Sequence, residues 1–191
     1  KIKGYFNNVS ENIKKWDKGP ESYINLEYKN EGFMMTIHTG DTVSEVIIDS
    51  GSSSIVISGE ECKKCPGTDK YPAIDSGKNR DIIRYGSQNN HVSWVKDDLK
   101  IGNIIFKNMN LAVTNKIVAK DLDPDDGEVE DVFNIFGIYP VYGYHSYSRG
   151  FWEEQGIYKN HCWAIMARKN GGRLYLGNWP SKLNNLKEDD M

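Results

Sequence analysis

Between residues 46 and 57 the chain reads Val46-Ile47-Ile48-Asp49-Ser50-Gly51-Ser52-Ser53-Ser54-Ile55-Val56-Ile57, so two runs of β-branched residues enclose an acid and a short polar turn. Such runs predict buried strands, and Asp49 stands where the first strand ends. Gly51 permits close backbone approach, and the hydroxyls of Ser50 and Ser52 can donate hydrogen bonds to an ionised acid. The stretch fits a catalytic carboxylate held between apolar walls, and it also fits an ordinary hairpin turn with a solvated Asp.

The rest of the chain is mostly β in character. Short apolar or alternating runs are separated by Gly, Asn, Asp and Ser, which is typical of an all-β domain. The predicted strands are Tyr23–Tyr28, Phe33–Ile37, Glu45–Asp49, Ile55–Ile57, Ile82–Tyr85, His91–Ile101, Ile104–Thr114, Val132–Ile138, His161–Arg168 and Arg173–Leu176. Two short helices are predicted near residues 10–16 and 150–155. No internal repeat with a period of about 20–50 residues indicates a solenoid or propeller.

Length and charge exclude several classes of function. A chain of 191 residues has the size of a single domain with a substantial core. The net charge of −3 gives no basic surface for nucleic acid, and no run approaches the roughly 18 apolar residues that span a bilayer. No apolar core follows the lysines of Lys1–Phe6, so these residues do not form a signal peptide. Either the chain is cytosolic or such a segment has already been removed.

Cysteines, histidines and acids give no convincing metal or cofactor site. Cys62-Lys63-Lys64-Cys65 fits a redox pair, half of a zinc site or a small disulfide loop, and the four histidines are scattered singly. The acidic segment 121–131 has the alternating acids of a calcium loop, but Val132 occupies the place of the last bidentate acid. We therefore expect a solvated loop there, and neither a metal nor a cofactor.

The order of these motifs resembles the amino-terminal lobe of the pepsin-like aspartic proteases. Asp49-Ser50-Gly51-Ser52 is similar to the Asp-Thr-Gly-Ser loop of that family, and Tyr85-Gly86 is similar to the start of its flap hairpin. Ile135–Ile138 resembles the strand that threads beside the catalytic loop, and residues 151–177 resemble the closing helix and hairpin. The resemblance runs from about residue 22 to residue 178. It implies a single all-β lobe, a closed or partly open β-barrel with a few short helices.

The resemblance also implies roles for the loop and flap residues. Asp49 would be one member of a carboxylate dyad that activates water, Ser52 would hydrogen-bond its outer oxygen, and Gly51 would bring a backbone N–H close to it. Ser50 stands where the family usually has Thr. Tyr85 and Gly86 would close over a peptide substrate. Residues 87–91, Ser-Gln-Asn-Asn-His, are bulkier and more polar than the small, Gly-rich flap tip usual in the family.

Cysteine pairing and location follow from the same resemblance. It implies a short disulfide between Cys62 and Cys65 shortly after the catalytic loop, and secretion or a vacuole- or lysosome-like compartment. Cys162 is then left over and is expected to be a small buried hydrophobe.

Only one lobe of the two-lobe family pattern is present. Residues 1–21 would be an extension or propeptide remnant, residues 22–180 the lobe, and residues 181–191 a polar tail. Asp75-Ser76-Gly77 lacks apolar strands on both sides and is expected to be a surface loop. The second acid would come from a second lobe or a second copy of the chain. The alternative is an inactive lobe kept as a binding or structural subunit beside unrelated proteins.

Overall fold

The computed structural model describes residues 23–29, 32–74, 79–85, 88–102, 104–119, 133–139, 163–168 and 170–176. The predicted extension 1–21, the tail 181–191, both predicted helices and the acidic loop lie outside these ranges, as do Asp75, Gly86 and Cys162. The lobe boundaries 22–180 stay a prediction.

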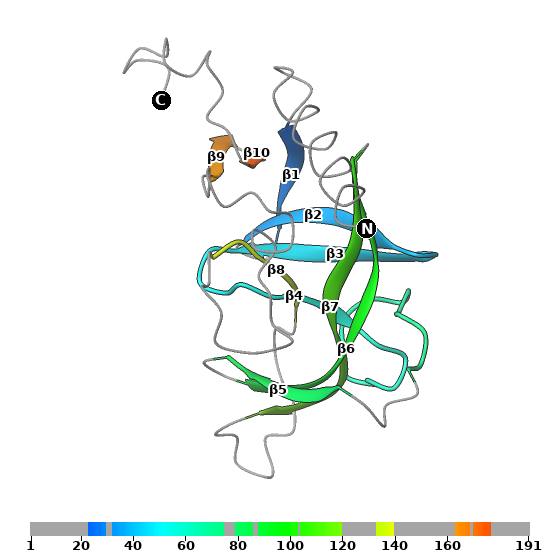
Figure 1. Cartoon of the computed structure of the whole chain (residues 1–191). Coiled ribbons are helices and arrows are strands. Elements are labelled where there is room, and N and C mark those ends of the chain that lie inside the picture. Colours follow the sequence, from blue (N-terminus) through cyan, green and yellow to red (C-terminus); the bar gives the residue numbers. More distant parts are fainter. Residues whose placement is uncertain are drawn as a thin grey trace, which may run out of the picture.

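The described residues form an all-β fold, as predicted (Figure 1). One sheet has the order β5-β6-β7-β4-β8-β3-β2-β1-β10-β9. A further pairing of β6 with β2, through Leu99 and Thr39, curls the sheet back on itself without producing a regular closed barrel. The strands are β1 Tyr23–Lys29, β2 Gly32–Thr39, β3 Thr42–Asp49, β4 Ile55–Ser58, β5 Arg80–Arg84, β6 Gln88–Ile101, β7 Ile104–Ala119, β8 Asn134–Gly137, β9 Trp163–Arg168 and β10 Gly171–Leu176.

The core lies inside this curl. Alternation along β3 buries Thr42, Ser44 and Val46, whereas Val43 and Glu45 are exposed. The short strands β4 and β8 are buried at every residue, as expected for strands covered on both faces. The largest side chains with almost no exposed surface include Phe106, Phe136, Ile37, Ile57 and Leu111.

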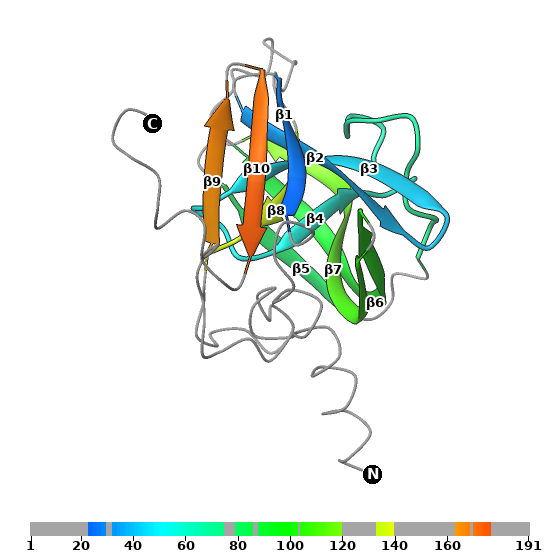
Figure 2. The same ribbon diagram turned by 90° about the horizontal axis from the view of Figure 1, so that it is seen from above.

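Two groups of strands extend from the core region. β5 and β6 form an antiparallel hairpin that continues into β7. In Figure 1, β5 and the lower ends of β6 and β7 lie below β4 and β8, whereas the other ends of β6 and β7 rise above them. β1, β10 and β9 lie side by side and end the sheet (Figure 2). Among the described strands, β5 and β9 therefore lie at the two ends of the sheet. No helix in the described part of the chain is long and apolar enough to cross a membrane.

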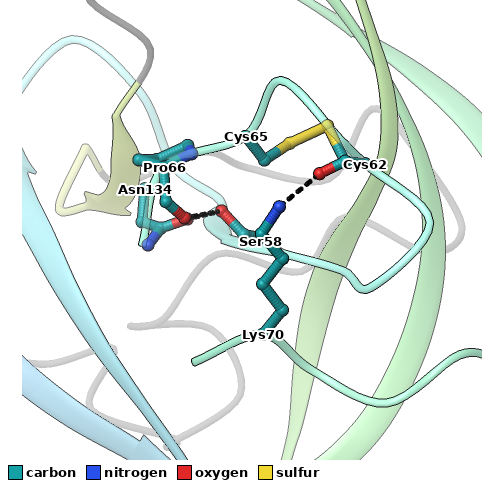
Figure 3. Close-up of a disulfide and its surroundings, with 6 residues drawn as sticks. All are labelled: Ser58, Cys62, Cys65, Pro66, Lys70 and Asn134. Carbon is teal, nitrogen blue, oxygen red and sulfur yellow. Dashed lines mark hydrogen bonds between the residues drawn. A yellow bond between two sulfur atoms is a disulfide. The ribbon is translucent and has the colours of Figure 1, made fainter. Parts of the chain in front are cut away.

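Cys62 and Cys65 form the disulfide that the family resemblance implied (Figure 3). Both cysteines are buried and pack against Ile117 of β7. The Nζ atom of Lys70 donates a hydrogen bond of 2.6 Å to the carbonyl oxygen of Cys62. The disulfide therefore anchors the segment after β4 against the long strand β7.

Reduction should release this anchor. We expect the intact chain to gain the mass of two hydrogen atoms on reduction, localised to a peptide that contains Cys62 and Cys65. In the chain-entropy model, closing so short a loop stabilises the fold by about 2 kcal/mol, so the thermal midpoint should fall on reduction. Mass spectrometry and a thermal melt with and without reductant test both points. An unchanged mass would rule out the disulfide.

Candidate active site

The loop between β3 and β4 holds the candidate catalytic acid. β3 ends at Asp49, and the polar residues 50–54 lead directly into β4. Asp49 is partly buried, whereas Ser50 and Gly51 are exposed. The N–H of Gly51 donates a hydrogen bond of 2.8 Å to Asp49 Oδ1. A backbone donor at this distance fixes the orientation of the carboxylate.

A neighbouring strand fixes the loop from the other side. β8 pairs in parallel with β3, which brings Gly137 beside Asp49. The N–H of Gly137 donates to Ser54 O at 3.0 Å, that of Ile138 to Asp49 O at 2.9 Å, and that of Tyr139 to Ser52 O at 2.8 Å. Three successive backbone donors thus hold the Asp49 loop along its length.

Gly137 is required for this approach. A methyl group added at residue 137 would lie 2.6 Å from the carbonyl oxygen of Ser52 and 2.6 Å from the nitrogen of Ser54. Those atoms belong to the backbone of the loop itself, so they cannot move aside as a flexible side chain would. The strand can thread beside the loop only because residue 137 has no side chain.

The β5–β6 hairpin brings Tyr85 to the same place. Tyr85 follows β5, and its N–H donates to Gln88 O at 2.8 Å, which closes the hairpin. Burial of its hydroxyl raises the pKa of Tyr85 well above 10, and the negative charge of Asp49 raises it further. The nearby Ser52 side chain lowers the pKa of Tyr85 and opposes part of this shift. Asp49, Ser52 and Tyr85 therefore meet, although they come from two separate parts of the chain.

An apolar wall lies behind this group. Ile83 and Tyr85 of the hairpin pack, with Ile47 of β3, against a buried cluster. The cluster consists of Val56, Val92, Trp94, Ala112 and Ile135. The indole N–H of Trp94 donates to Asp81 at 3.2 Å and so ties β6 to β5. Tyr85, whose side chain lies within reach of the Asp49 charge, is therefore backed by apolar side chains.

Sequence reasoning missed how deeply the polar stretch after Tyr85 is buried. Residues 88–91 belong to β6, and Gln88 and Asn90 are buried, with exposed fractions of 5% and 0%. Their alternate spacing matches the period of two along a strand, which is the signal that could have revealed a shared inward face.

The site as described contains one strong candidate acid and no metal cluster. Within the described ranges, no group of three or more His, Cys, Asp or Glu side chains could hold a metal ion. A single carboxylate can bind and orient water. Removing a proton from water while protonating a peptide carbonyl requires a second acid close to the first.

Comparisons with known proteins agree with this arrangement. Residues 33–127 match the family model described as eukaryotic aspartyl protease. The fold is similar to the crystal structure of aspartic proteinase from Irpex lacteus, with a TM-score of 0.58 and 13% sequence identity. The match covers 83% of this chain and 48% of that one, so the chain spans about half the length of this similar structure. No curated protein sequence gives a significant match.

The electrostatic contact between Asp49 and Tyr85 is testable without any substrate. Asp49→Asn should lower the pKa of Tyr85, which would remain above 10 because the hydroxyl stays buried. The ultraviolet absorbance of tyrosinate is followed as the pH is raised. The difference between the titration of the wild-type protein and that of Tyr85→Phe isolates the ionisation of Tyr85. Because folding raises the pKa of Tyr85, the buried neutral phenol stabilises the folded protein fully below about pH 10. This stabilisation is lost as the pH rises through the pKa that Tyr85 has in the folded protein.

Asp98→Asn is the matched control, since Asp98 is an exposed acid of β6 that pairs with Lys107. It should leave the titration of Tyr85 unchanged. A Tyr85 pKa that is the same with and without the Asp49 charge would contradict the proximity of the two groups.

Proposed function

Because this chain has the fold of a pepsin-like aspartic protease lobe, we propose that it is the amino-terminal lobe of an aspartic endopeptidase and supplies Asp49 to a catalytic dyad. The observation that carries the proposal is the convergence at Asp49. A backbone N–H from Gly51 orients the carboxylate, the β8 strand fixes its loop, and the buried Tyr85 side chain lies within reach of its charge.

The chemistry needs two carboxylates that share one proton. Two acids at hydrogen-bonding distance cannot both ionise, so one is charged and the other protonated. The charged acid takes a proton from water, and the water oxygen attacks the carbonyl carbon of the peptide. The protonated acid donates its proton to the carbonyl oxygen, and collapse of the tetrahedral intermediate with protonation of the nitrogen breaks the C–N bond. Asp49 would be one of the two acids, and Tyr85 would shield the reacting groups from water.

The second acid would come from a second lobe or from a second copy of this chain. The match covers only 48% of the similar structure, which supports a second part of comparable size. A two-fold dimer would also bring two copies of Asp49 together, and closed two-fold dimers are the commonest oligomers.

The β9 edge offers a place for such a partner. In the described part of the chain β9 pairs only with β10, and residues Trp163 to Ala167 carry no charge. The other edge, β5, carries Arg80, Asp81 and Arg84 in five residues, the usual protection against unwanted strand pairing. An uncharged edge can accept a further strand. We therefore place the second lobe or second copy against β9.

Secretion, or residence in a vacuole- or lysosome-like compartment, is part of the same proposal. The Cys62–Cys65 disulfide supports it, because disulfides persist in oxidising compartments and are rare in the cytosol.

Replacement of the proposed catalytic acid tests the enzyme function. Asp49→Asn should lower kcat/KM for peptide cleavage at about pH 4 by roughly a thousandfold or more, because one half of the dyad can no longer ionise. The exposed acid Asp98 provides the control, and Asp98→Asn should cleave at the wild-type rate. Unchanged cleavage by Asp49→Asn would remove Asp49 from the mechanism.

A second candidate function is a pepsin-like lobe kept for binding or assembly. It is favoured by the polar flap sequence, in which bulky residues replace a small tip and Gln88 and Asn90 are buried. Such a subunit would bind unrelated proteins on the surface that a second lobe would otherwise cover.

Native mass spectrometry of the purified protein separates the two functions. For the enzyme, we expect a second lobe or a self-dimer together with cleavage at about pH 4 that a statine-type inhibitor blocks. A complex with unrelated proteins, or an isolated monomer without cleavage, would instead support the binding function.

A further inference from the structure

Asn90 has a fully buried side chain that has no hydrogen-bond partner within the described part of the chain. It lies in β6, opposite Ile83 of β5 on one side and Ile117 of β7 on the other. Its exposed fraction is 0%, and neither Oδ1 nor Nδ2 of its side chain has a partner. Both of its cross-strand neighbours are apolar and offer neither a donor nor an acceptor. The amide is thus removed from water without any compensating hydrogen bond.

The position of Asn90 links it to the candidate active site. Residues paired directly across an antiparallel ladder share a face, so Asn90 lies on the same face of the hairpin as Ile83. Ile83 and Tyr85 both pack against the buried cluster that includes Val92, two residues along β6 from Asn90. Asn90 therefore lies on the inner face of the hairpin, where the hairpin packs against the lobe.

Asn134 shows what a satisfied buried Asn looks like in this fold. Its Oδ1 accepts a hydrogen bond of 2.7 Å from Ser58 Oγ, and its Nδ2 donates one of 3.2 Å to Glu45 O (Figure 3 shows the first of these). Asn134 is 6% exposed, close to the value for Asn90. The two residues differ in hydrogen bonding far more than in burial, so their substitutions should have opposite effects on stability.

We propose that Asn90 weakens the packing of the β5–β6 hairpin on the lobe and thereby sets how readily the hairpin that carries Tyr85 lifts away from Asp49. In the closed position the amide of Asn90 lacks partners. When the hairpin lifts, water hydrates the amide and the penalty disappears. Asn90 therefore favours the open position relative to an apolar residue of similar size.

For the enzyme function proposed above, this opening would admit the peptide and release the products. That consequence rests on the proposed function. The effect of Asn90 on the hairpin does not, because it depends only on burial and hydrogen bonding.

Asn90→Leu tests the inference without any substrate. Leu has a similar volume and no polar atoms, so the closed hairpin should become more stable. Hydrogen exchange of the Tyr85 amide, which donates to Gln88 O within the hairpin, should slow by about tenfold. The Gly59 amide, which donates to Thr114 O outside the hairpin, should change much less. The same substitution should leave the thermal midpoint unchanged or raise it.

Asn134→Leu is the matched control. It would remove the hydrogen bonds that Asn134 makes with Ser58 Oγ and Glu45 O and would leave Ser58 Oγ only the contact with Pro66 O, so it should lower the thermal midpoint. If Asn90→Leu lowers the midpoint as Asn134→Leu does, or leaves the exchange of Tyr85 unchanged or faster, the inference is wrong, because the amide of Asn90 is then satisfied in the folded protein. If exchange slows as expected while the wild-type protein cleaves no peptide, the proposed enzyme function fails and the inference about the hairpin stands.

Discussion

The backbone contact between β8 and the Asp49 loop is the constraint on which the candidate site depends. Asp49 is the last residue of a strand, and a strand end followed by serines would ordinarily be free to move. Three amides of residues 137–139 hold the loop, and they reach it only because Gly137 has no side chain to separate the two backbones. The carboxylate is thereby oriented before any substrate or partner arrives, which is the condition for electrostatic catalysis.

The hairpin that carries Tyr85 meets a different requirement. In the proposed enzyme the hairpin would act as a lid that shields the acid from water and also opens, so its packing would be weaker than that of the core. Apolar contacts of Ile83 and Tyr85 favour closure, whereas the buried amide of Asn90 opposes it. A region that moves is expected to have low local stability, and a buried, unpaired polar group is one physical way to achieve it.

The two edges of the sheet differ in a way that bears on assembly. β5 carries charges of both signs, and β9 carries none before its final residue, Arg168. The chain also spans about half of the similar structure. Among the described strands, β9 lacks the charges that protect β5, and the two strands lie at opposite ends of the strand order.

The sequence by itself determined the all-β class and the strand that ends at Asp49, because β-branched runs and small polar turns act locally along the chain. It also indicated β8 and the Tyr85 turn, through the resemblance of short motifs to one family. It did not reveal that, among the described residues, the buried side chain of Asn90 has no hydrogen-bond partner and β9 pairs only with β10, because both depend on which strands become neighbours. Only the tertiary structure decided that Tyr85 lies near Asp49, since 36 residues separate them (85 − 49) and long-range strand pairing brings them together.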